Sequence, residues 1–330
     1  LWEPLIQLGD RLRLKQRQAY RNWLSLTDVV NLMHLTGFEV IRTGTRTLLP
    51  VWIPFVSHVI NRVLAVLPGL RHLCVTTFVV ARLSPTRRAD TDSCSVIIPC
   101  RNEAGNIAGA VARTPVMGAW TELIFVDGNS TDGTVAAIEA EMRAHPERRI
   151  SLIHQGAGAG KGDAVRKGFA AAKGNILMIL DADLTAPPED LPRFYAAVAS
   201  RVGELVMGSR LVYPMEKQAM RFLNLIGNKV FSLLFTWLLD QPIKDTLCGT
   251  KVLWREDYER IAAGRGLFGD FDPFGDFDLI FGAARLHLKI VEIPIRYRER
   301  TYGTTNISRW RHGALLFRMC GVALRRLKLA

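Results

Sequence analysis

From Cys94 to Asp183 the chain alternates short apolar runs with segments of helical periodicity. The apolar runs are typical of buried strands, whereas the segments between them carry apolar residues at every third or fourth position. The predicted strands are SVIIP, ELIFVD, ISLIHQ and NILMIL, and the predicted helices span 106–113, 134–145 and 162–173. Strands that alternate with helices predict an α/β fold with a mostly parallel sheet and helices on both faces.

Residues 1–84 carry a second, shorter α/β pattern. SLTDVVNLMHLTG predicts a helix that is capped by Ser25 or Thr27 and ends at Gly37, and the strand FEVI follows it. A further helical run at 55–67 leads to the strand CVTTFVVA. The polar run LSPTRRADTDSC then predicts a domain boundary. We therefore expect a first domain at 1–84, a linker at 85–92 and a second domain at 93–330.

The first of these domains resembles the C-terminal end of class I S-adenosylmethionine-dependent methyltransferases. DVVNLMHLTGFEVI stands in the place of that family's last helix and sixth strand, and CVTTFVVAR in the place of its seventh. The resemblance implies a partial Rossmann-like α/β segment. Because residues 1–84 contain no glycine-rich cofactor loop, we expect this segment to contribute packing and to bind no cofactor.

The charge of the chain is high and unevenly distributed. The formal net charge is +12, and the stretch from Arg285 onward holds eleven Lys and Arg against two acidic residues, Glu292 and Glu299. Such a stretch favours a polyanionic partner, whether nucleic acid, anionic lipid or a phosphorylated substrate. No recognised nucleic-acid-binding motif is present, so we expect no nucleic-acid partner. Five cysteines without a CxxC pair predict reduced thiols and a cytoplasmic setting.

Polar residues follow the predicted strands of the second domain, where ligands of parallel sheets bind. Asp181 and Asp183 come directly after the strand NILMIL, and an i, i+2 pair tends to point the same way. Two convergent carboxylates repel each other unless a cation binds them, and oxygen ligands favour Mg²⁺ or Mn²⁺. The residues alone leave a second interpretation equally open, in which the DAD sequence caps the following helix.

The second domain closely resembles family 2 glycosyltransferases, and among them the polyprenyl-phosphate sugar transferases. The matching stretches follow the family order over most of 93–313: SVIIPCRNE, FVDGNSTDGT, GAGKGDAVRKGFAAAKGNILMILDADL, GSRL, DTLCGTK and FDLIFGAARLHLKIVEIPIRYRERTYGTTNISRWRHG. The resemblance implies the GT-A type nucleotide-diphospho-sugar transferase fold. It also implies an inverting, metal-dependent hexosyltransferase that uses a GDP- or UDP-sugar.

The resemblance assigns roles to individual residues. Asp181 and Asp183 are the implied ligands of Mg²⁺ or Mn²⁺, and the implied catalytic residues are Asp183, Arg210, Asp278 and Arg300. The nucleotide sugar is expected to contact Pro99, Arg101, Glu103, Val126, Asp127, Lys161, Asp181 and Ala182. For Lys161, at the start of a predicted helix, a solvated side chain is an equal alternative to phosphate binding.

Three positions depart from the family pattern. Arg101 stands where an aromatic residue is frequent, and Gly128 replaces the second acid of the usual DD pair. Asn306 stands where the mannosyltransferases tend to have a lysine. These departures leave the base of the donor and the contact with the acceptor open.

Residues 220–239 are long and apolar enough to raise the question of a membrane-spanning helix. Their polar residues recur every three or four positions, which instead predicts an amphipathic helix with one polar stripe: Arg221, Asn224, Asn228, Ser232 and Thr236. Such a helix either lies in the membrane interface or packs against the protein or a second copy of the chain. Because the C-terminal segment is also basic and amphipathic, we expect a peripheral enzyme on the cytoplasmic face of the membrane.

The acceptor decides between two mechanisms. A lipid phosphate is already ionised, so it needs cations to position it; Arg300 would bind it with help from Arg298, Arg309 or His312. A sugar hydroxyl instead needs a base, which would be Asp278 or, less favourably, Asp276. The amphipathic segments favour the lipid phosphate, with the saccharide hydroxyl as the alternative.

Overall fold

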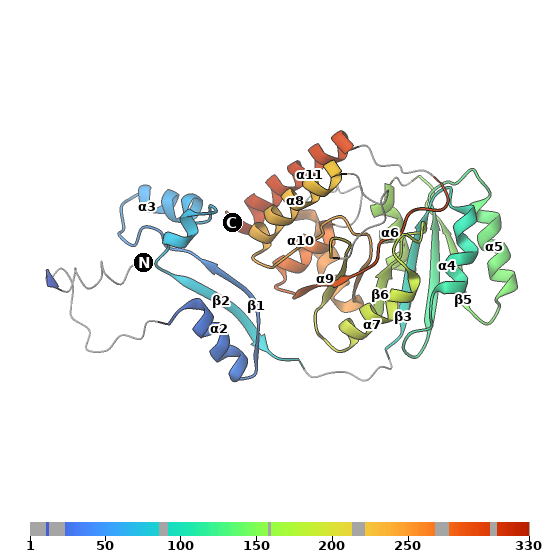
Figure 1. Ribbon diagram of the computed structural model, residues 1–330, viewed down its shortest axis with the longest axis horizontal. Helices are drawn as coiled ribbons and strands as arrows, with labels where there is room; N and C mark the ends of the chain where they lie inside the picture. The colour runs from blue at the N-terminus through green and yellow to red at the C-terminus, as the bar shows by residue number, and fades with distance from the viewer. Residues whose placement is uncertain are drawn as a thin grey trace. The chain divides into compact units, whose positions relative to one another are not determined.

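The computed structural model describes residues 11–12, 24–85, 92–157, 160–212, 222–267, 277–303 and 309–329. The chain divides into two compact units, Leu1–Ser84 with Lys328–Ala330, and Pro85–Leu327 (Figure 1). The division falls within the polar run LSPTRRADTDSC. Most of the expected linker, 86–91, lies outside the described residues.

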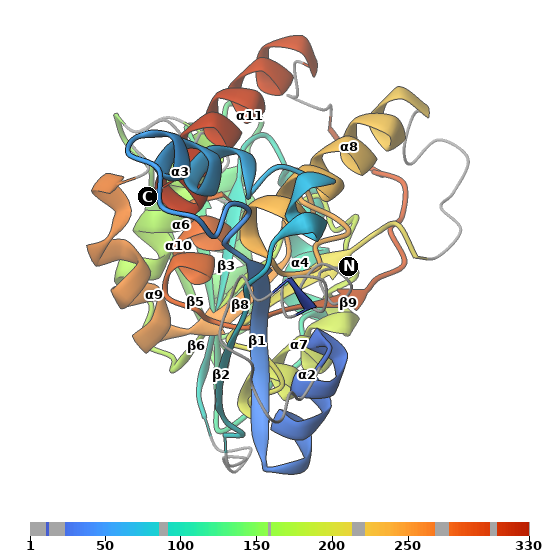
Figure 2. The ribbon, with the colours of Figure 1, turned by 90° about the vertical axis from the view of Figure 1, so that its left-hand side faces the viewer.

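The first unit is built around a pair of antiparallel strands. Its regular elements are α2 (Leu26–Leu35), β1 (Phe38–Thr45), α3 (Val56–Val59) and β2 (Thr77–Leu83). β1 pairs with β2, and α2 packs against β1 (Figure 2). Ser25 is the cap of α2, because its hydroxyl accepts a hydrogen bond from the Asp28 amide while the Asp28 carboxylate accepts one from the Ser25 amide. Gly37 follows the helix with a φ of +80°, which favours glycine.

The second unit follows the predicted alternation of strands and helices. Its strands are β3 (Cys94–Cys100), β4 (Thr121–Asp127), β5 (Arg149–His154), β6 (Ile176–Ile179), β7 (Leu205–Ser209), β8 (Lys251–Trp254) and β9 (Ile290–Pro294). Its helices are α4 (Ile107–Arg113), α5 (Thr134–Ala144), α6 (Gly160–Ala171), α7 (Leu191–Ala199), α8 (Phe222–Leu239), α9 (Arg255–Ala263), α10 (Phe277–Arg285) and α11 (Arg309–Ala323). The helices predicted at 106–113, 134–145 and 162–173 are therefore confirmed to within a few residues as α4, α5 and α6.

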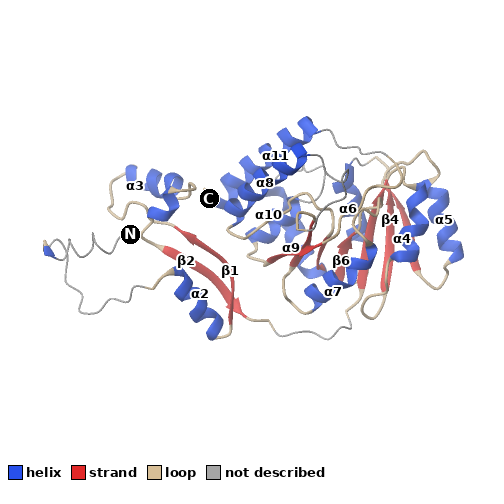
Figure 3. Cartoon of the chain, in the orientation of Figure 1, coloured by secondary structure: helices blue, strands red, loops and turns tan. Residues whose placement is uncertain are grey.

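Seven strands of the described chain form one sheet in the order β5-β4-β3-β6-β8-β7-β9. Figure 3 shows strands in red and helices in blue. The pairs among β5, β4, β3 and β6 are parallel, and β7 is parallel to β9, whereas β8 runs antiparallel to both of its neighbours. The prediction of a mostly parallel sheet is confirmed. The carboxyl ends of β3, β4 and β6 therefore lie at one edge of the sheet, and their loops meet there.

Helices cover both faces of this sheet and bury a separate apolar cluster on each. One cluster joins β-strand residues such as Val96 and Phe125 to Val111 of α4, Ile138 of α5 and Phe194 of α7. The other face is covered by α6 and by the helices of the C-terminal half, α8 to α11. These two clusters fix the strand ends that carry the polar loops.

The polar stripe of α8 faces the protein, and not solvent. Asn228 is buried against Asp245, and the hydroxyls of Ser232 and Thr236 donate hydrogen bonds to the Ile243 carbonyl at 2.6 and 3.1 Å. The sequence left two placements of this helix open, the membrane interface and packing against protein, and the polar stripe packs against the protein. The hydroxyls of the stripe bind backbone groups of Ile243, which would otherwise lack a hydrogen-bond partner in the described chain. Arg221 and the side chain of Asn224 lie outside the described residues.

The outer side of α8 is apolar and adjoins α11. Leu233 is 73% exposed and Val230 47%, and Phe317 of α11, 56% exposed, packs its ring 4.9 Å from that of Phe231. Within the described residues, we find no helix that combines the length and the apolar character needed to cross a membrane.

Candidate active site

The loops after β3 and β4 are joined to each other at the carboxyl edge of the sheet. The parallel register places Pro99 beside Val126 and Cys100 beside Asp127. Beyond these pairs, the Asn102 amide donates to the Ser130 hydroxyl at 2.9 Å, and the Asn102 side chain accepts from the Thr131 amide at 2.8 Å. The two loops therefore form one surface on which Arg101 is exposed.

Asp127 is a buried residue at the end of β4. Its side chain is 4% exposed and accepts hydrogen bonds of 3.3 Å from the Ser130 amide, and the ring of His154 lies 3.9 Å away. Val126, also expected to contact the nucleotide, has its side chain in the core, so it presents backbone atoms alone to this edge. Both positions fit a nucleotide that lies across the ends of β3 and β4.

Asp181 follows β6 and is paired with Lys161 of α6. The Lys161 amino group lies 2.5 Å from the Asp181 carboxylate, and 27% of the Lys161 side chain is exposed. Contact of this lysine with phosphate stays a prediction. Burial raises the pKa of Asp181, but Lys161, with Lys251 and Arg210, outweighs burial, so the pKa lies below its usual value. The carboxylate is therefore ionised at neutral pH.

Gly249 makes this arrangement possible. A Cβ atom at position 249 would overlap the Asp181 carboxylate and the Lys161 amino group. The loop after α8 can approach the aspartate closely because the residue has no side chain. The sequence placed Gly249 within the motif DTLCGTK, but no pattern in one sequence indicates which side chains it approaches.

Asp183 is paired with Arg300, which also binds Glu103. One terminal nitrogen of Arg300 lies 2.6 Å from Asp183, and the other donates to Glu103 at 2.9 Å. The second oxygen of Asp183 accepts from the amide and hydroxyl of Thr185 at 3.1 and 2.8 Å. Arg300 thus joins the loop after β3 to the loop after β6. Its guanidinium is suited to bind phosphate oxygens as well as these carboxylates.

The helix-capping interpretation of the DAD sequence is wrong. The 3-10 turn Pro188–Asp190 and α7 have no side-chain cap, and Asp183 instead closes its own turn at Thr185. Asp181 and Asp183 are therefore available for chemistry at the edge of the sheet.

The chemistry of this donor set fits Mg²⁺ or Mn²⁺ held jointly with a diphosphate. No group of three or more His, Cys, Asp or Glu side chains suited to a metal occurs in the part of the chain that the structure describes. Mg²⁺ characteristically takes one or two carboxylates and completes its shell with water and substrate phosphates. Lys161 and Arg300 neutralise the two carboxylates in the structure, so a bound cation would take over their role.

Arg210 lies in a buried network behind the two aspartates. Its guanidinium forms a two-point ion pair with Asp245 at 2.7 and 2.8 Å, Asn228 of α8 donates to the same carboxylate at 3.0 Å, and the Tyr297 ring lies 5.1 Å from the guanidinium carbon. The Arg210 side chain is 11% exposed and that of Asp245 is fully buried. Arg210 therefore contributes positive charge near Asp181 from a fixed position. Sequence reasoning missed Asp245 and Asn228, because neither stands at a strand end.

We expect Asp245→Ala to lower the free energy of unfolding by about 3–5 kcal/mol, because it leaves the Arg210 guanidinium buried without its partner. Burial raises the pKa of Asp245, but Arg210 and Asn228 lower it to about 2, below the ordinary value of 3.8. The stabilisation from this carboxylate is thus present above pH 4 and is lost as the pH falls toward 2. Urea unfolding of the wild type and Asp245→Ala across this range measures both effects, with Glu139→Ala on the surface of α5 as control.

Asp278 lies in the first turn of α10, in a different ion-pair group. Arg265 lies 3.0 Å from its carboxylate and Arg166 of α6 lies 3.9 Å away, and the Asp278 side chain is 8% exposed. Arg166 is five residues beyond Lys161, a distance of about 7.5 Å along the helix axis. Arg265 and Arg166 therefore hold Asp278 in an ion-pair group separate from the one around Asp181 and Asp183.

The structure thus brings together half of the twelve site residues predicted from sequence. Lys161, Arg300 and Glu103 converge on Asp181 and Asp183, and Ala182, 4% exposed, lies between the aspartates. Arg298 lines a neighbouring pocket. The remaining expected contacts lie outside the described residues, either entirely or as side chains: Asp276, Asn306, Arg309 and His312.

The sheet order and the acidic loop after its central strand define a GT-A type transferase fold, and a solved structure agrees. Glucosyl-3-phosphoglycerate synthase from Mycobacterium tuberculosis superposes with a TM-score of 0.51 at 22% identity, over 72% of this chain and 81% of that one. The fold class predicted from the sequence is confirmed.

The chain belongs to glycosyl transferase family 2, whose model matches residues 95–261, and it is a glycosyltransferase. It is 40% identical over 109 residues to dolichol-phosphate mannosyltransferase from Saccharomyces cerevisiae, a match that covers 32% of this chain and 40% of the yeast protein. It is 30% identical over 234 residues to polyprenol monophosphomannose synthase from Mycolicibacterium smegmatis, covering 69% of this chain and 84% of that protein.

Proposed function

We propose that this protein transfers a sugar from a nucleotide diphosphate to a polyprenyl phosphate, with inversion at the anomeric carbon. The observation that carries the proposal is the arrangement around Asp181 and Asp183, in which each carboxylate is bound by a cationic side chain at the end of β6. The relatives named for dolichol-phosphate and polyprenol-phosphate substrates support the choice of acceptor.

The proposed mechanism assigns a task to each side of the site. The loops after β3 and β4 bind the nucleoside, through Arg101, Glu103 and Asp127. Asp181 and Asp183 would hold a divalent cation, which would supply positive charge to the diphosphate leaving group. Lys161 and Arg300 exchange their carboxylate partners for phosphate oxygens when the donor binds, and so they hold the reactants in line.

The position of Asp278 supports a phosphate acceptor over a hydroxyl acceptor. A general base must reach the proton that it removes, and it works best when it is not already bound by cations. Arg265 and Arg166 contact the same carboxylate oxygen of Asp278, at 3.0 and 3.9 Å, so that oxygen already has cationic partners. A phosphate oxygen needs no base, and single displacement by it inverts the anomeric carbon.

The α8–α11 surface supports a peripheral position at a membrane, where a polyprenyl chain is found. Leu233, Val230 and Phe317 are exposed there, and the exposed residues Lys229 and Arg318 lie next to them in the sequence. Apolar side chains that are flanked by basic ones suit the interface of an anionic bilayer. We propose that this surface, on the cytoplasmic face, brings the lipid acceptor to the site.

A transfer assay with paired acceptors tests the proposed function. The full chain, Mn²⁺ and a panel of radiolabelled GDP- and UDP-sugars are incubated with a short-chain prenyl phosphate or with the corresponding prenyl alcohol. We expect a labelled prenyl-phosphate sugar with at least one donor, no product from the alcohol, and loss of product when the metal is chelated. Product on the alcohol or on a saccharide alone would replace this proposal with the hydroxyl mechanism.

We also propose that residues 1–84 are a methyltransferase-like packing element without a cofactor site. The order of α2, β1 and β2 and the antiparallel pairing of the two strands support this relationship. The sugar-transfer proposal does not depend on it, because the aspartates, their cationic partners and the nucleotide loops all belong to the second unit.

A further inference from the structure

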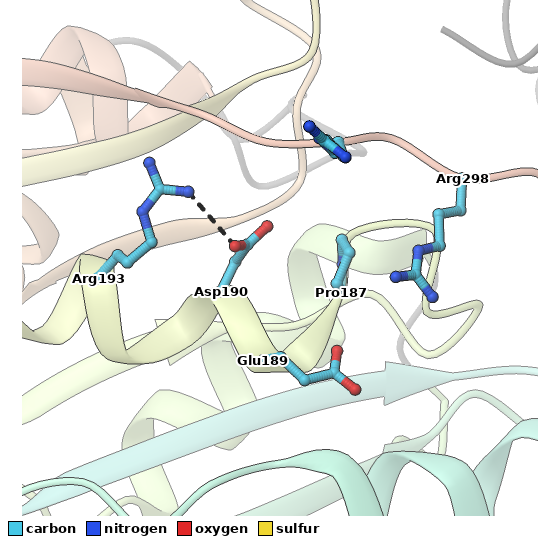
Figure 4. Close-up of a pocket in the computed structure, with 6 residues that line it drawn as sticks. Pro187, Glu189, Asp190, Arg193 and Arg298 are labelled. Atoms are coloured by element: carbon cyan, nitrogen blue, oxygen red, sulfur yellow. Dashed lines mark hydrogen bonds and ion pairs between the residues drawn. The ribbon is translucent and has the colours of Figure 1, made fainter. Parts of the chain in front are cut away.

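We propose that a second anion site lies beside the donor site, in a pocket formed by Arg193, Arg296 and Arg298, and that it binds a phosphate-class oxyanion. The pocket has a volume of about 350 Å³, and Pro187, Glu189 and Asp190 complete its lining. Figure 4 shows Arg193 and Arg298 on opposite sides of Pro187, with Asp190 next to Arg193. We call it the arginine pocket.

Positive charge exceeds negative charge in the arginine pocket. Both oxygens of Glu189 are bound by Arg113 of α4, at 2.7 and 2.9 Å, and Arg113 is not part of the lining. These hydrogen bonds keep the pKa of Glu189 below its usual value, so it is ionised and paired at neutral pH. Asp190 is likewise paired with Arg193, at 3.3 Å. With Arg113 included, these residues comprise four guanidinium groups and two carboxylates. The excess favours an anionic ligand.

The backbone that carries two of the arginines is fixed at several points. The Ile295 amide donates to the Ser209 carbonyl at 3.0 Å, and the Arg298 amide donates to the Thr185 carbonyl at 2.9 Å. Between them, Tyr297 is held against the buried Arg210. Arg193 of α7 reaches the Pro294 carbonyl at 3.3 Å, so the third arginine is tied to the same segment. Binding an anion therefore requires little ordering of the backbone.

The chemistry of the lining selects phosphate among anions. Guanidinium groups bind phosphate through paired, planar hydrogen bonds, and three of them around one pocket match its several oxygens. Pro187 is the one apolar residue of the lining. A phosphate ester in solution and the headgroup of an anionic lipid both carry the required group.

This site is distinct from that of the transferred group. Its lining contains neither Asp181, Asp183, Lys161 nor Arg300. It adjoins the donor site through Thr185, whose carbonyl binds the Arg298 amide and whose amide binds Asp183. The inference stands independently of sugar transfer, since it can be tested without donor, acceptor or metal.

Calorimetry with inorganic phosphate and the full chain tests the site. We expect Arg296→Gln and Arg298→Gln each to weaken phosphate binding about tenfold, since each removes one charge-assisted contact. Glu189→Gln should tighten binding, whereas Arg113→Gln should weaken it from outside the pocket, because it leaves Glu189 to compete for the arginines. Arg143→Gln, which removes a charge from the exposed face of α5, is the matched control.

Arg143→Gln separates a phosphate site from a general loss of charge, because it removes the same charge outside the pocket and should leave phosphate affinity unchanged. Equal phosphate affinity in the wild type, Arg296→Gln and Arg298→Gln, with unchanged unfolding temperatures, would overturn the proposal. Vesicles of phosphatidylcholine with and without phosphatidylglycerol identify the source of the phosphate. If Arg298→Gln reduces binding to the anionic vesicles and phosphate competes for them, the ligand is a headgroup. If the variant affects phosphate alone, it is a soluble ester.

Discussion

Asp183→Asn is expected to lower kcat/KM for sugar transfer about a thousandfold, which corresponds to roughly 4 kcal/mol of transition-state stabilisation. The change removes the charge that holds a divalent cation against the diphosphate. It keeps the local fold, because an asparagine oxygen can still accept the hydrogen bond from the Thr185 amide, at 3.1 Å in the wild type. Asp181→Asn should behave similarly, since its partner Lys161 is 27% exposed and can turn to water.

The control for these variants is a second aspartate in the same unit. Asp257→Asn removes a carboxylate that is 7% exposed and paired with Arg260 at the start of α9. It should leave transfer unchanged. In parallel, calorimetry of nucleoside diphosphate binding with and without Mn²⁺ should show tighter binding with the metal in the wild type and no such gain in Asp183→Asn. A variant that keeps most of its activity, or a wild type that binds nucleotide equally without metal, would contradict the metal assignment.

The sequence predicted the strands, and the place of the acidic residues at their ends, because both depend on local order along the chain. An apolar run that ends in a carboxylate fixes a strand and the group at its end, and β4 and β6 follow that pattern. The partners of the carboxylates could not be predicted in the same way. Arg300 reaches Asp183 across 117 residues and Glu103 across 197, distances that no periodicity encodes.

The buried polar stripe of α8 is the clearest feature whose direction could not be predicted from the sequence. A helix with one polar stripe usually turns that stripe to water, and the pattern of α8 is the same whichever way it faces. The stripe is buried because Ile243 and Asp245 lie against it and need its hydrogen bonds. The outcome depends on the path of a loop, which becomes visible only in three dimensions.

Comparison of Arg300→Ala with Asp278→Asn distinguishes the two mechanisms of acceptor activation. Arg300 bridges Asp183 and Glu103 at 2.6 and 2.9 Å, and in the proposed mechanism it holds phosphate oxygens. With a short-chain prenyl phosphate, we expect Arg300→Ala to lower kcat/KM by about two to three orders of magnitude. Asp278→Asn should lower it by less than about tenfold, since that carboxylate only orients Arg166 and Arg265.

Two further measurements test whether the loss of activity in these variants reflects only a change in structure. Arg300→Lys keeps the charge but not the two-point contact with Glu103 and Asp183, so it should recover part of the lost kcat/KM. The pH dependence supplies the second measurement, because a phosphate acceptor loses its last proton near pH 6 and needs no base above that value. The activity of Asp278→Asn should therefore follow the wild-type pH profile. If that variant instead collapses, with a profile that rises as hydroxide replaces the missing base, the acceptor is a hydroxyl and Asp278 removes its proton.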